Sequence, residues 1–280
     1  SNCEGLSDHL LPGLEPLGVP KGLAHTMVPV LYNSVGALDQ AFMENPDLSI
    51  IVMEGARYEF ATEEFLNRVG HYQAKGVVVV FDEITSGFRY GPRGVYKNYD
   101  FTPDIVAYGK GMGNGYAISA VVGKGDVMAT AQDSFISSTF WTERIGFVAA
   151  LATIEEFQEN EVASHLVEVG DKIGRGWEEL AKSRGIELST SSFKPLITFK
   201  LNYGDFNTEL VTLFIQEMLQ RGYLSTTSVY VSQAHTDQAV EKYLDAVNEV
   251  FLILKKAIDS ESAKPYLKTS LRDEGFKRLT

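Results

Sequence analysis

A lysine, Lys110, stands inside the glycine-rich segment GKGMGNG, directly after the short apolar run IVAY. Burial lowers the pKa of a lysine amine and frees it as a nucleophile, so a lysine at the end of a buried strand suits Schiff-base chemistry. The flanking glycines let the backbone turn sharply and let a bulky ligand approach. The alternative is a solvated lysine in a loop, and the spacing alone leaves both interpretations open.

The same glycine segment excludes two common phosphate-binding loops. A dinucleotide-binding fingerprint requires G-x-G-x-x-G, and no register of the segment supplies it. A P-loop requires Ser or Thr after its lysine, but Gly111 stands there. The lysine itself therefore remains as the candidate for chemistry.

A second candidate is Asp82, which directly follows the apolar run VVVVF. An aspartate at the end of a strand can pair with the nitrogen of a pyridinium ring. The alternative is a structural role, as the N-cap of the following segment or as a turn former.

Taken together, the segments FDEITSGFR, TPDIVAYGKGMGNG and ISAVVG resemble the signature of class III pyridoxal-phosphate (PLP) aminotransferases. In that family a strand-end aspartate precedes a glutamate and then a Thr/Ser-Gly-Phe-Arg stretch, and Thr-Pro-Asp opens the strand that ends at the cofactor lysine. The segments GVPKGL, IVMEG and SQAHTDQAVEKYLDAV also resemble relatives of glutamate-1-semialdehyde aminomutase. The resemblance thus extends over almost the whole chain.

The resemblance implies a role for five residues and no metal. Lys110 would form the Schiff base with PLP, and Asp82 would hold the pyridinium nitrogen. Thr85 would hydrogen-bond the ring's 3-oxygen. Ser138 and Thr139 would bind the cofactor phosphate and reach the neighbouring subunit of a homodimer. The alternative for these two is that SSTFWTE is a loop and cap before a helix.

Four other polar residues receive smaller roles. Glu54 follows a strand where the family carries a glutamate, and we expect it to have a supporting role. The histidines His25, His71 and His235 are expected to be structural.

The elements that must position these residues follow from hydrophobic periodicity. Short apolar runs predict strands at residues 48–53, 77–81, 105–108 and 118–122, and helical spacing predicts helices at 63–73 and 143–158. The second helix is expected to bury Ile145, Val148, Ala149, Ala152 and Ile154. Alternating strands and helices indicate a mostly parallel sheet covered on both faces, with ligands beyond the carboxyl ends of its strands. Asp82 and Lys110 both fall at such ends.

After about residue 160 the pattern changes to that of a smaller α+β domain. It predicts helices at 162–183, 208–220 and 237–258, a strand at 196–201 and a strand pair at 223–233. We therefore predict an α/β protein with two domains. The family resemblance implies that residues 1–158 form part of the large domain of a fold-type I PLP enzyme, truncated at its start, and that residues 159–280 form a small C-terminal domain.

Two features depart from the family's pattern. Family members begin with a long N-terminal half that supplies a glycine-rich phosphate loop and an aromatic that stacks on the ring. Nothing before Leu31 provides them, so we expect a fragment or a part of a longer protein. Aminomutase relatives carry a glutamate eight residues before the histidine of the AHT motif, where this chain has Thr227. That absence favours a transaminase over the isomerase. The closing GFKRL resembles polysaccharide-associated members of the group, and this resemblance implies a carbohydrate-linked substrate.

Composition narrows the partners and the compartment. The formal charge of −12 argues against nucleic acid or an anionic membrane as a partner. The single cysteine, Cys3, allows no intramolecular disulfide, which favours a cytoplasmic location. No apolar stretch reaches the length of a membrane span, and no signal peptide is recognised. The expected partners are a small-molecule amino donor and acceptor. An aminomutase, a catalytically silent assembly protein and an inert fragment remain as alternatives.

Overall fold

The computed structural model describes residues 20–23 and 26–272, which divide into two compact units between Glu161 and Val162. The expected irregular segment at residues 1–30 lies largely outside the described residues. The predicted domain boundary, between residues 158 and 159, falls close to this division. Its meaning as the border of a large and a small domain stays a prediction.

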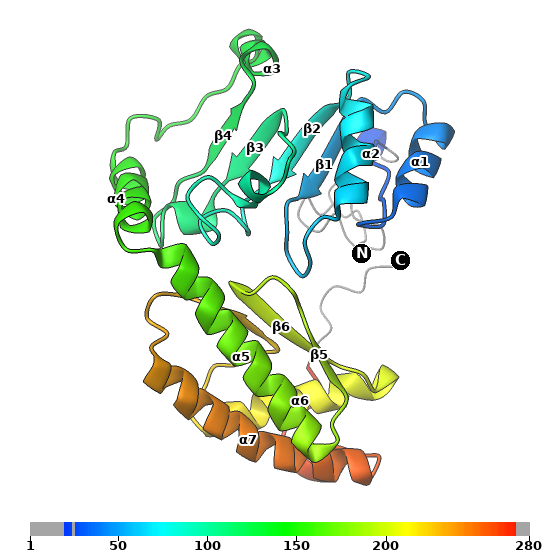
Figure 1. The fold of residues 1–280 in the computed structure, drawn as a ribbon, viewed down its shortest axis with the longest axis vertical. Helices are drawn as coiled ribbons and strands as arrows, with labels where there is room; N and C mark the ends of the chain where they lie inside the picture. Colours follow the sequence, from blue (N-terminus) through cyan, green and yellow to red (C-terminus); the bar gives the residue numbers. More distant parts are fainter. Residues whose placement is uncertain (1–19, 24–25, 273–280) are drawn as a thin grey trace. The chain divides into compact units, whose positions relative to one another are not determined.

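The first unit is built on a four-stranded sheet with the order β1-β2-β3-β4 (Figure 1). Its strands are β1 (Ile50–Glu54), β2 (Val78–Asp82), β3 (Ile105–Tyr108) and β4 (Ala120–Gly123). The first three are parallel, and β4 runs antiparallel to β3. The register pairs Glu54 with Asp82 and Asp82 with Ala107, so the carboxyl ends of β1, β2 and β3 lie at one edge of the sheet. All four predicted strands are present, with ends shifted by a few residues.

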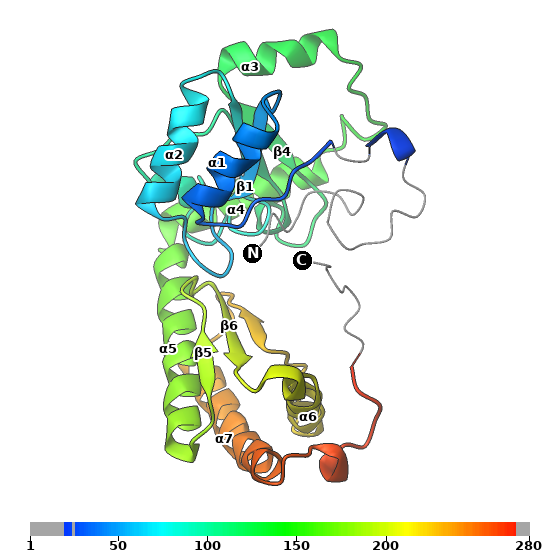
Figure 2. The same ribbon diagram turned by 90° about the vertical axis from the view of Figure 1, so that its right-hand side faces the viewer.

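Two helices, α1 (Val35–Glu44) and α2 (Glu63–Gln73), lie side by side against the sheet (Figures 1 and 2). Between them, the rings of Phe42 and Tyr72 stack with 3.8 Å between centroids. The helix α2 has the predicted bounds, and the Thr62 hydroxyl caps it by accepting a hydrogen bond from the Phe65 amide at 3.3 Å. The helix α1 was not predicted. Short helices complete the unit: η2 (Lys21–Leu23), η3 (Val95–Asn98), η4 (Lys110–Met112), α3 (Gly125–Ala129) and η5 (Thr130–Asp133).

The helix α4 (Ile145–Glu159) lies where a helix was predicted. Of the face predicted to be buried, Ile145, Val148 and Ala152 are exposed, whereas Ile154 packs partly buried against the core. The buried residues of α4 are Gly146, Ala150 and Thr153. Apolar side chains before and along α4 are instead exposed, and we call them the α4 surface: Phe135, Ile136, Phe140, Trp141, Ile145, Phe147, Val148 and Leu151. The helix is apolar nearly all round, so its sequence could not show which side meets the unit's own core.

The Asp104 carboxylate explains why Thr-Pro-Asp opens β3. It accepts hydrogen bonds from the Val79 amide at 2.7 Å, from the Gln73 side chain at 2.9 Å and from the Lys124 amine at 2.7 Å. Burial alone would raise the pKa of Asp104, but these bonds outweigh it and hold that pKa below its ordinary value. The carboxylate therefore fastens β2 to the chain that follows β4.

The second unit combines a three-stranded antiparallel sheet, β5 (Leu188–Thr190), β6 (Leu196–Leu201) and β7 (Ser228–Tyr230), with three long helices. These are α5 (Val162–Arg184), α6 (Asn207–Gln220) and α7 (Asp237–Asp259). The short helix η6 (Gly204–Phe206) precedes α6, and η7 (Lys264–Tyr266) follows α7. The predicted strand pair at 223–233 is wrong, because only β7 forms there and it pairs with β6. The strand β5 was not predicted.

An aromatic cluster forms the core of the second unit. Trp177, Phe199, Phe214 and Phe251 are at most 1% exposed. The Trp177 and Phe199 rings meet edge to face at 4.9 Å, as do Phe199 and Phe214 at 5.1 Å. Edge-to-face aromatic pairs add stability beyond the area they bury. This cluster holds α5, β6, α6 and α7 together.

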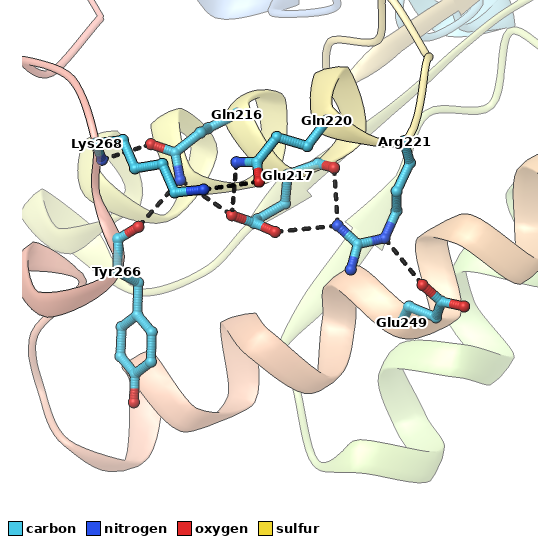
Figure 3. Close-up of polar contacts among 7 residues, drawn as sticks. All are labelled: Gln216, Glu217, Gln220, Arg221, Glu249, Tyr266 and Lys268. Carbon is cyan, nitrogen blue, oxygen red and sulfur yellow. Dashed lines mark hydrogen bonds and ion pairs between the residues drawn. The ribbon is translucent and has the colours of Figure 1, made fainter.

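A polar network joins the end of α6 to α7 and to the segment after η7 (Figure 3). Glu217 accepts hydrogen bonds from Gln216 at 3.0 Å, from Gln220 at 3.1 Å and from Arg221 at 3.0 Å. Arg221 also bonds to Glu249 at 3.0 Å. The side chain of Glu217 is 11% exposed, whereas that of Glu249 is 65% exposed. The same guanidinium thus serves one buried and one solvated carboxylate.

This pair of carboxylates makes a matched test of burial. Glu217→Gln is expected to lower the free energy of unfolding by about 1–3 kcal/mol, because three donors lose a charged acceptor in a buried site. Glu249→Gln should cost less than about 1 kcal/mol. Urea unfolding followed by the fluorescence of buried Trp177 measures both. Equal costs for the two variants would contradict the expectation.

The same comparison has a pH dependence. Burial would raise the pKa of Glu217, but its hydrogen bonds from Gln216 and Arg221 hold that pKa below its ordinary value. A lowered pKa in the folded state adds stability above the unfolded-state pKa, about 4.3, and this stability is lost as the pH falls through the folded-state pKa. The difference between the wild type and Glu217→Gln should therefore narrow on acidification.

No helix within residues 20–23 and 26–272 has both the length and the apolar character needed to cross a bilayer.

Candidate active site

Asp82 ends β2 at the carboxyl edge of the sheet and is 7% exposed. Its Oδ1 accepts a hydrogen bond from the Ile84 amide at 2.9 Å. Such an aspartate bond to the second following amide shapes a turn. The turn-forming role considered for Asp82 is therefore present, and a bond to a ring nitrogen stays a prediction.

Lys110 begins η4, two residues after β3 ends, and its φ of +44° lies in the left-handed region. A non-glycine residue in that region is strained, and such strain gathers at functional sites. The Lys110 amine donates a hydrogen bond to Thr85 Oγ1 at 2.8 Å. The structure thus brings together two of the residues that the sequence predicts, from the ends of two neighbouring parallel strands.

The expectation that Lys110 is buried is wrong, because its side chain is exposed. Lys110 lies in η4, none of whose residues is buried, and its amine bonds to the Thr85 hydroxyl. The strand that leads to Lys110 is nevertheless buried at Val106 and Tyr108. The lysine therefore stands at a buried strand's end without being buried itself.

Two other lysines of the first unit are engaged elsewhere. Lys124, which opens the chain after β4, forms an ion pair with Asp104 at 2.7 Å. The Lys97 amine lies over the Tyr96 ring, 4.9 Å from its centroid. Of these three lysines, only Lys110 meets a neutral hydroxyl at the carboxyl edge of the sheet.

The segment Thr85–Arg89 folds into a tight loop that is fixed by steric constraints, ring packing and a hydrogen bond. Gly87 leaves no room for a side chain, since a Cβ there would lie 2.5 Å from the Glu83 carbonyl oxygen and 2.9 Å from the Tyr108 ring. Phe88 takes a φ of +58°, and its ring packs against those of Tyr108 and Phe157. The bend returns Arg89 to the start of the loop, where its Nε donates to the Thr85 carbonyl at 2.8 Å.

Glu83 and Ser86 form a buried pair to which sequence reasoning assigned no role. Both are 0% exposed, and the Ser86 hydroxyl donates to Glu83 Oε2 at 2.5 Å. Burial raises the pKa of Glu83, while hydrogen bonds from Ser86, Tyr96 and Val95 oppose the rise. The available signal was a second acidic residue directly after a buried strand, which needs buried partners if it does not face a ligand.

Ser138 and Thr139 lie in an exposed loop between η5 and α4. The Ser138 hydroxyl accepts a long hydrogen bond from the Phe140 amide at 3.4 Å. Within the described part of the chain, no hydrogen bond joins either residue to Lys110, Asp82 or Thr85. In the single chain, Ser138 and Thr139 therefore belong to a loop before α4, and their binding of the cofactor phosphate stays a prediction.

The remaining polar candidates take part in local contacts. Glu54 forms an ion pair with Arg57 at 3.4 Å. His71 packs edge to face against Tyr72, and His235 Nδ1 accepts from the Ser232 amide at 3.0 Å. His25 lies outside the described residues. No group of three or more metal-binding side chains occurs among residues 20–23 and 26–272.

The second unit holds a cavity of about 710 Å³, between the segment around β7 and the helices α5 and α7. Its polar lining includes Tyr223, Thr226, Ser228, His235 and Tyr243. None of the lining residues is an aspartate, glutamate, lysine or arginine. Thr227 lies between two of these residues, and its carbonyl accepts from the Phe199 amide at 2.9 Å. The segment that lacks the aminomutase glutamate thus borders an uncharged cavity.

The fold is shared with solved transaminase-like structures. The FumI protein of Sphingopyxis sp. MTA144 superposes with a TM-score of 0.77 at 23% identity, over 85% of this chain and 60% of that one. An omega-transaminase from Sphaerobacter thermophilus gives 0.77 at 22% identity, over 84% and 59%. The predicted α/β fold of the fold-type I class is therefore confirmed.

Sequence comparison points to the same class of enzymes. Residues 51–188 match the family model of the class-III aminotransferases. It is 28% identical to 3-aminobutyryl-CoA aminotransferase from Cloacimonas acidaminovorans, over 86% of this chain and 61% of that protein. It is 27% identical to glutamate-1-semialdehyde 2,1-aminomutase from Pyrobaculum aerophilum, over 86% and 62%. The chain spans about three fifths of the length of these relatives.

Proposed function

We propose that the protein is a PLP-dependent aminotransferase that moves an amino group between a small-molecule donor and a small or carbohydrate-linked carbonyl acceptor. The observation that carries the proposal is the Lys110 amine on the Thr85 hydroxyl at the carboxyl edge of β2 and β3. Asp82 ends the neighbouring strand. An amine, a hydroxyl and a carboxylate are the groups that PLP's aldehyde, ring oxygen and ring nitrogen require, so these residues fit the cofactor.

When bound, PLP supplies an aldehyde carbon that an amine can attack and a ring that withdraws electrons from the reacting carbon. Lys110 would hold the cofactor covalently, be displaced by the incoming amine and then move a proton between the substrate carbon and the cofactor. Asp82 would keep the ring nitrogen protonated, since a nearby carboxylate favours a cation. Thr85 would orient the ring through its 3-oxygen.

An aminomutase is the second candidate, because relatives of both kinds are about equally similar to this chain, at 28% and 27% identity. Thr227 and the uncharged cavity beside it support the transaminase. A carboxylate there could retain a cationic diamino intermediate, which an isomerase must keep and a transaminase need not. The closing GFKRL, the reason for a carbohydrate-linked substrate, lies outside the described residues.

The deciding experiment assays the purified protein with PLP, first with glutamate-1-semialdehyde and then with a panel of amino donors and keto acceptors. Net amino transfer to an added acceptor supports the proposal. Rapid formation of 5-aminolevulinate without net transfer would instead identify the isomerase. A protein with no absorbance band that borohydride removes would be a silent assembly protein or an inert fragment.

We also propose that the protein is a homodimer with shared sites. The α4 surface supports this, because apolar side chains such as Phe147 and Leu151 are 57% and 59% exposed in the single chain. Thr139 lies in the loop that carries part of this surface. A second copy that covers the surface would therefore have its own active site close to Thr139.

Sedimentation at micromolar concentration is expected to show a dimer, and Leu151→Asp should shift it to monomer. A charge in a buried apolar contact costs several kcal/mol, about 10²-fold or more in the dimer dissociation constant. Leu252→Asp is the matched control, since Leu252 is 50% exposed on α7 in the second unit. Wild-type protein that sediments only as monomer would refute the shared site.

We further infer a cytoplasmic location from the single cysteine, and no nucleic-acid or membrane partner from the formal charge of −12.

A further inference from the structure

We propose that Glu83 is a positioning residue: it fixes the place of Thr85 and, through Thr85, the amine of Lys110. The consequence for catalysis rests on the proposed function, whereas the consequence for the Lys110 amine does not. Glu83 is adjacent to Asp82 but turns into the protein, where it is 0% exposed. Glu83 is therefore buried beneath the candidate site and would act on it only through other residues.

The Glu83 side chain joins the loop to a second segment. Oε2 accepts from the Ser86 hydroxyl at 2.5 Å, and Oε1 accepts from the Tyr96 amide at 2.9 Å. Ser86 directly follows Thr85, and Tyr96 belongs to η3. The carboxylate thus ties the residue after Thr85 to η3.

The Glu83 backbone joins the loop to the strand that carries the lysine. Its amide donates to the Ala107 carbonyl on β3 at 2.9 Å, and its carbonyl accepts from the Gly87 amide at 2.7 Å. Thr85 lies between these anchor points. Because β3 leads directly to Lys110, the same residue aligns both partners of the bond between Thr85 and Lys110.

The space around the carboxylate indicates a fitted site. Gly94 takes a φ of +85°, and a Cβ there would lie 2.8 Å from the Glu83 carboxyl carbon. Backbone therefore approaches the carboxylate where any larger residue would push it away. An amide of the same shape would keep an acceptor for Tyr96 but would force Ser86 to accept rather than donate.

A double-mutant cycle separates positioning from general stability. Acetic anhydride labels lysines at low occupancy, and mass spectrometry gives the rate at Lys110 relative to Lys97, with no cofactor present. Thr85→Val should raise the relative rate about three- to tenfold, because the amine no longer has to leave a hydrogen bond before it reacts. Glu83→Gln should raise it too, and the double variant should not exceed Thr85→Val alone.

Stability provides the contrasting readout. Both Glu83→Gln and Thr85→Val are expected to lower the free energy of unfolding. If Glu83 acts on Lys110 through Thr85, the effects of the two changes on the labelling rate of Lys110 are not additive. Asp104→Asn is the control, since Asp104 is buried like Glu83, at 7% exposed, and holds β2, while no hydrogen bond in the described part of the chain joins it to Lys110. It should lower stability without changing the labelling of Lys110.

Additive labelling effects, or labelling unchanged by Glu83→Gln, would overturn the inference. If Glu83→Gln does not fold, Ser86→Ala removes one bond of the same pair and is read in the same cycle with the same criteria. Borohydride trapping of PLP is measured in parallel. If the wild type traps no PLP, the proposed function is contradicted, while the labelling cycle still decides the role of Glu83.

Discussion

Replacing Lys110 with alanine is expected to abolish covalent capture of PLP and to lower amino transfer by at least about 10²-fold, the lower range for loss of a proton-transferring group. The Lys110 amine stands at the end of β3 on the Thr85 hydroxyl, 2.8 Å away. The Lys110→Ala variant should keep its fold, because the Lys110 side chain is exposed and contributes no core packing. Loss of capture in this variant therefore reports chemistry and not unfolding.

The measurement is borohydride reduction of the PLP-loaded protein, followed by mapping of the tagged peptide. The wild type should carry the tag on Lys110. Lys97→Ala is a suitable control, since Lys97 lies over the Tyr96 ring and should not affect the tag. A tag on Lys124 or Lys97 in the wild type would refute the assignment.

The change Asp82→Asn is expected to lower amino transfer more than about tenfold while leaving the fold nearly intact. The fold should survive because an asparagine oxygen can still accept from the Ile84 amide, as Asp82 Oδ1 does at 2.9 Å. Activity should fall because a neutral amide stabilises a protonated ring nitrogen poorly.

Two measurements must agree for this second prediction. Circular dichroism and urea unfolding should match the wild type closely, and the rate of net amino transfer should fall. Activity that stays within about twofold of the wild type corresponds to well under 1 kcal/mol and would show that Asp82 acts only in the turn.

Sequence reasoning located the edge of the sheet where the candidate residues lie. The runs VVVVF and IVAY are short, apolar and followed at once by polar residues, so both the strands and their ends could be recognised. The structure places β2 and β3 as parallel neighbours, which brings the ends at Asp82 and Tyr108 to one edge. The contact between Thr85 and Lys110 follows from that arrangement together with the loop between them.

The rest depended on information that is not local in the chain. The buried face of α4 could not be read, because Phe147 and Val148, which are exposed, are more apolar than the buried residues Gly146, Ala150 and Thr153. The partners that bury Glu83 could not be read either, since the Tyr96 amide and the Gly94 backbone come from more than ten residues further along the chain. Lys110 is exposed in η4, none of whose residues is buried, and periodicity carries no signal for so short a helix.

The bend at Phe88 also limits how the protein can be engineered. Glycine is the usual remedy for a residue with a positive φ, here +58°, and it would relieve a strain of about 1–3 kcal/mol. It would also delete a ring that is 7% exposed and packs against Tyr108 and Phe157, at a cost of about 3–5 kcal/mol. The packing loss is larger than the relief. A thermostabilisation campaign that replaces strained positions by rule would therefore weaken this chain at the loop that presents Thr85.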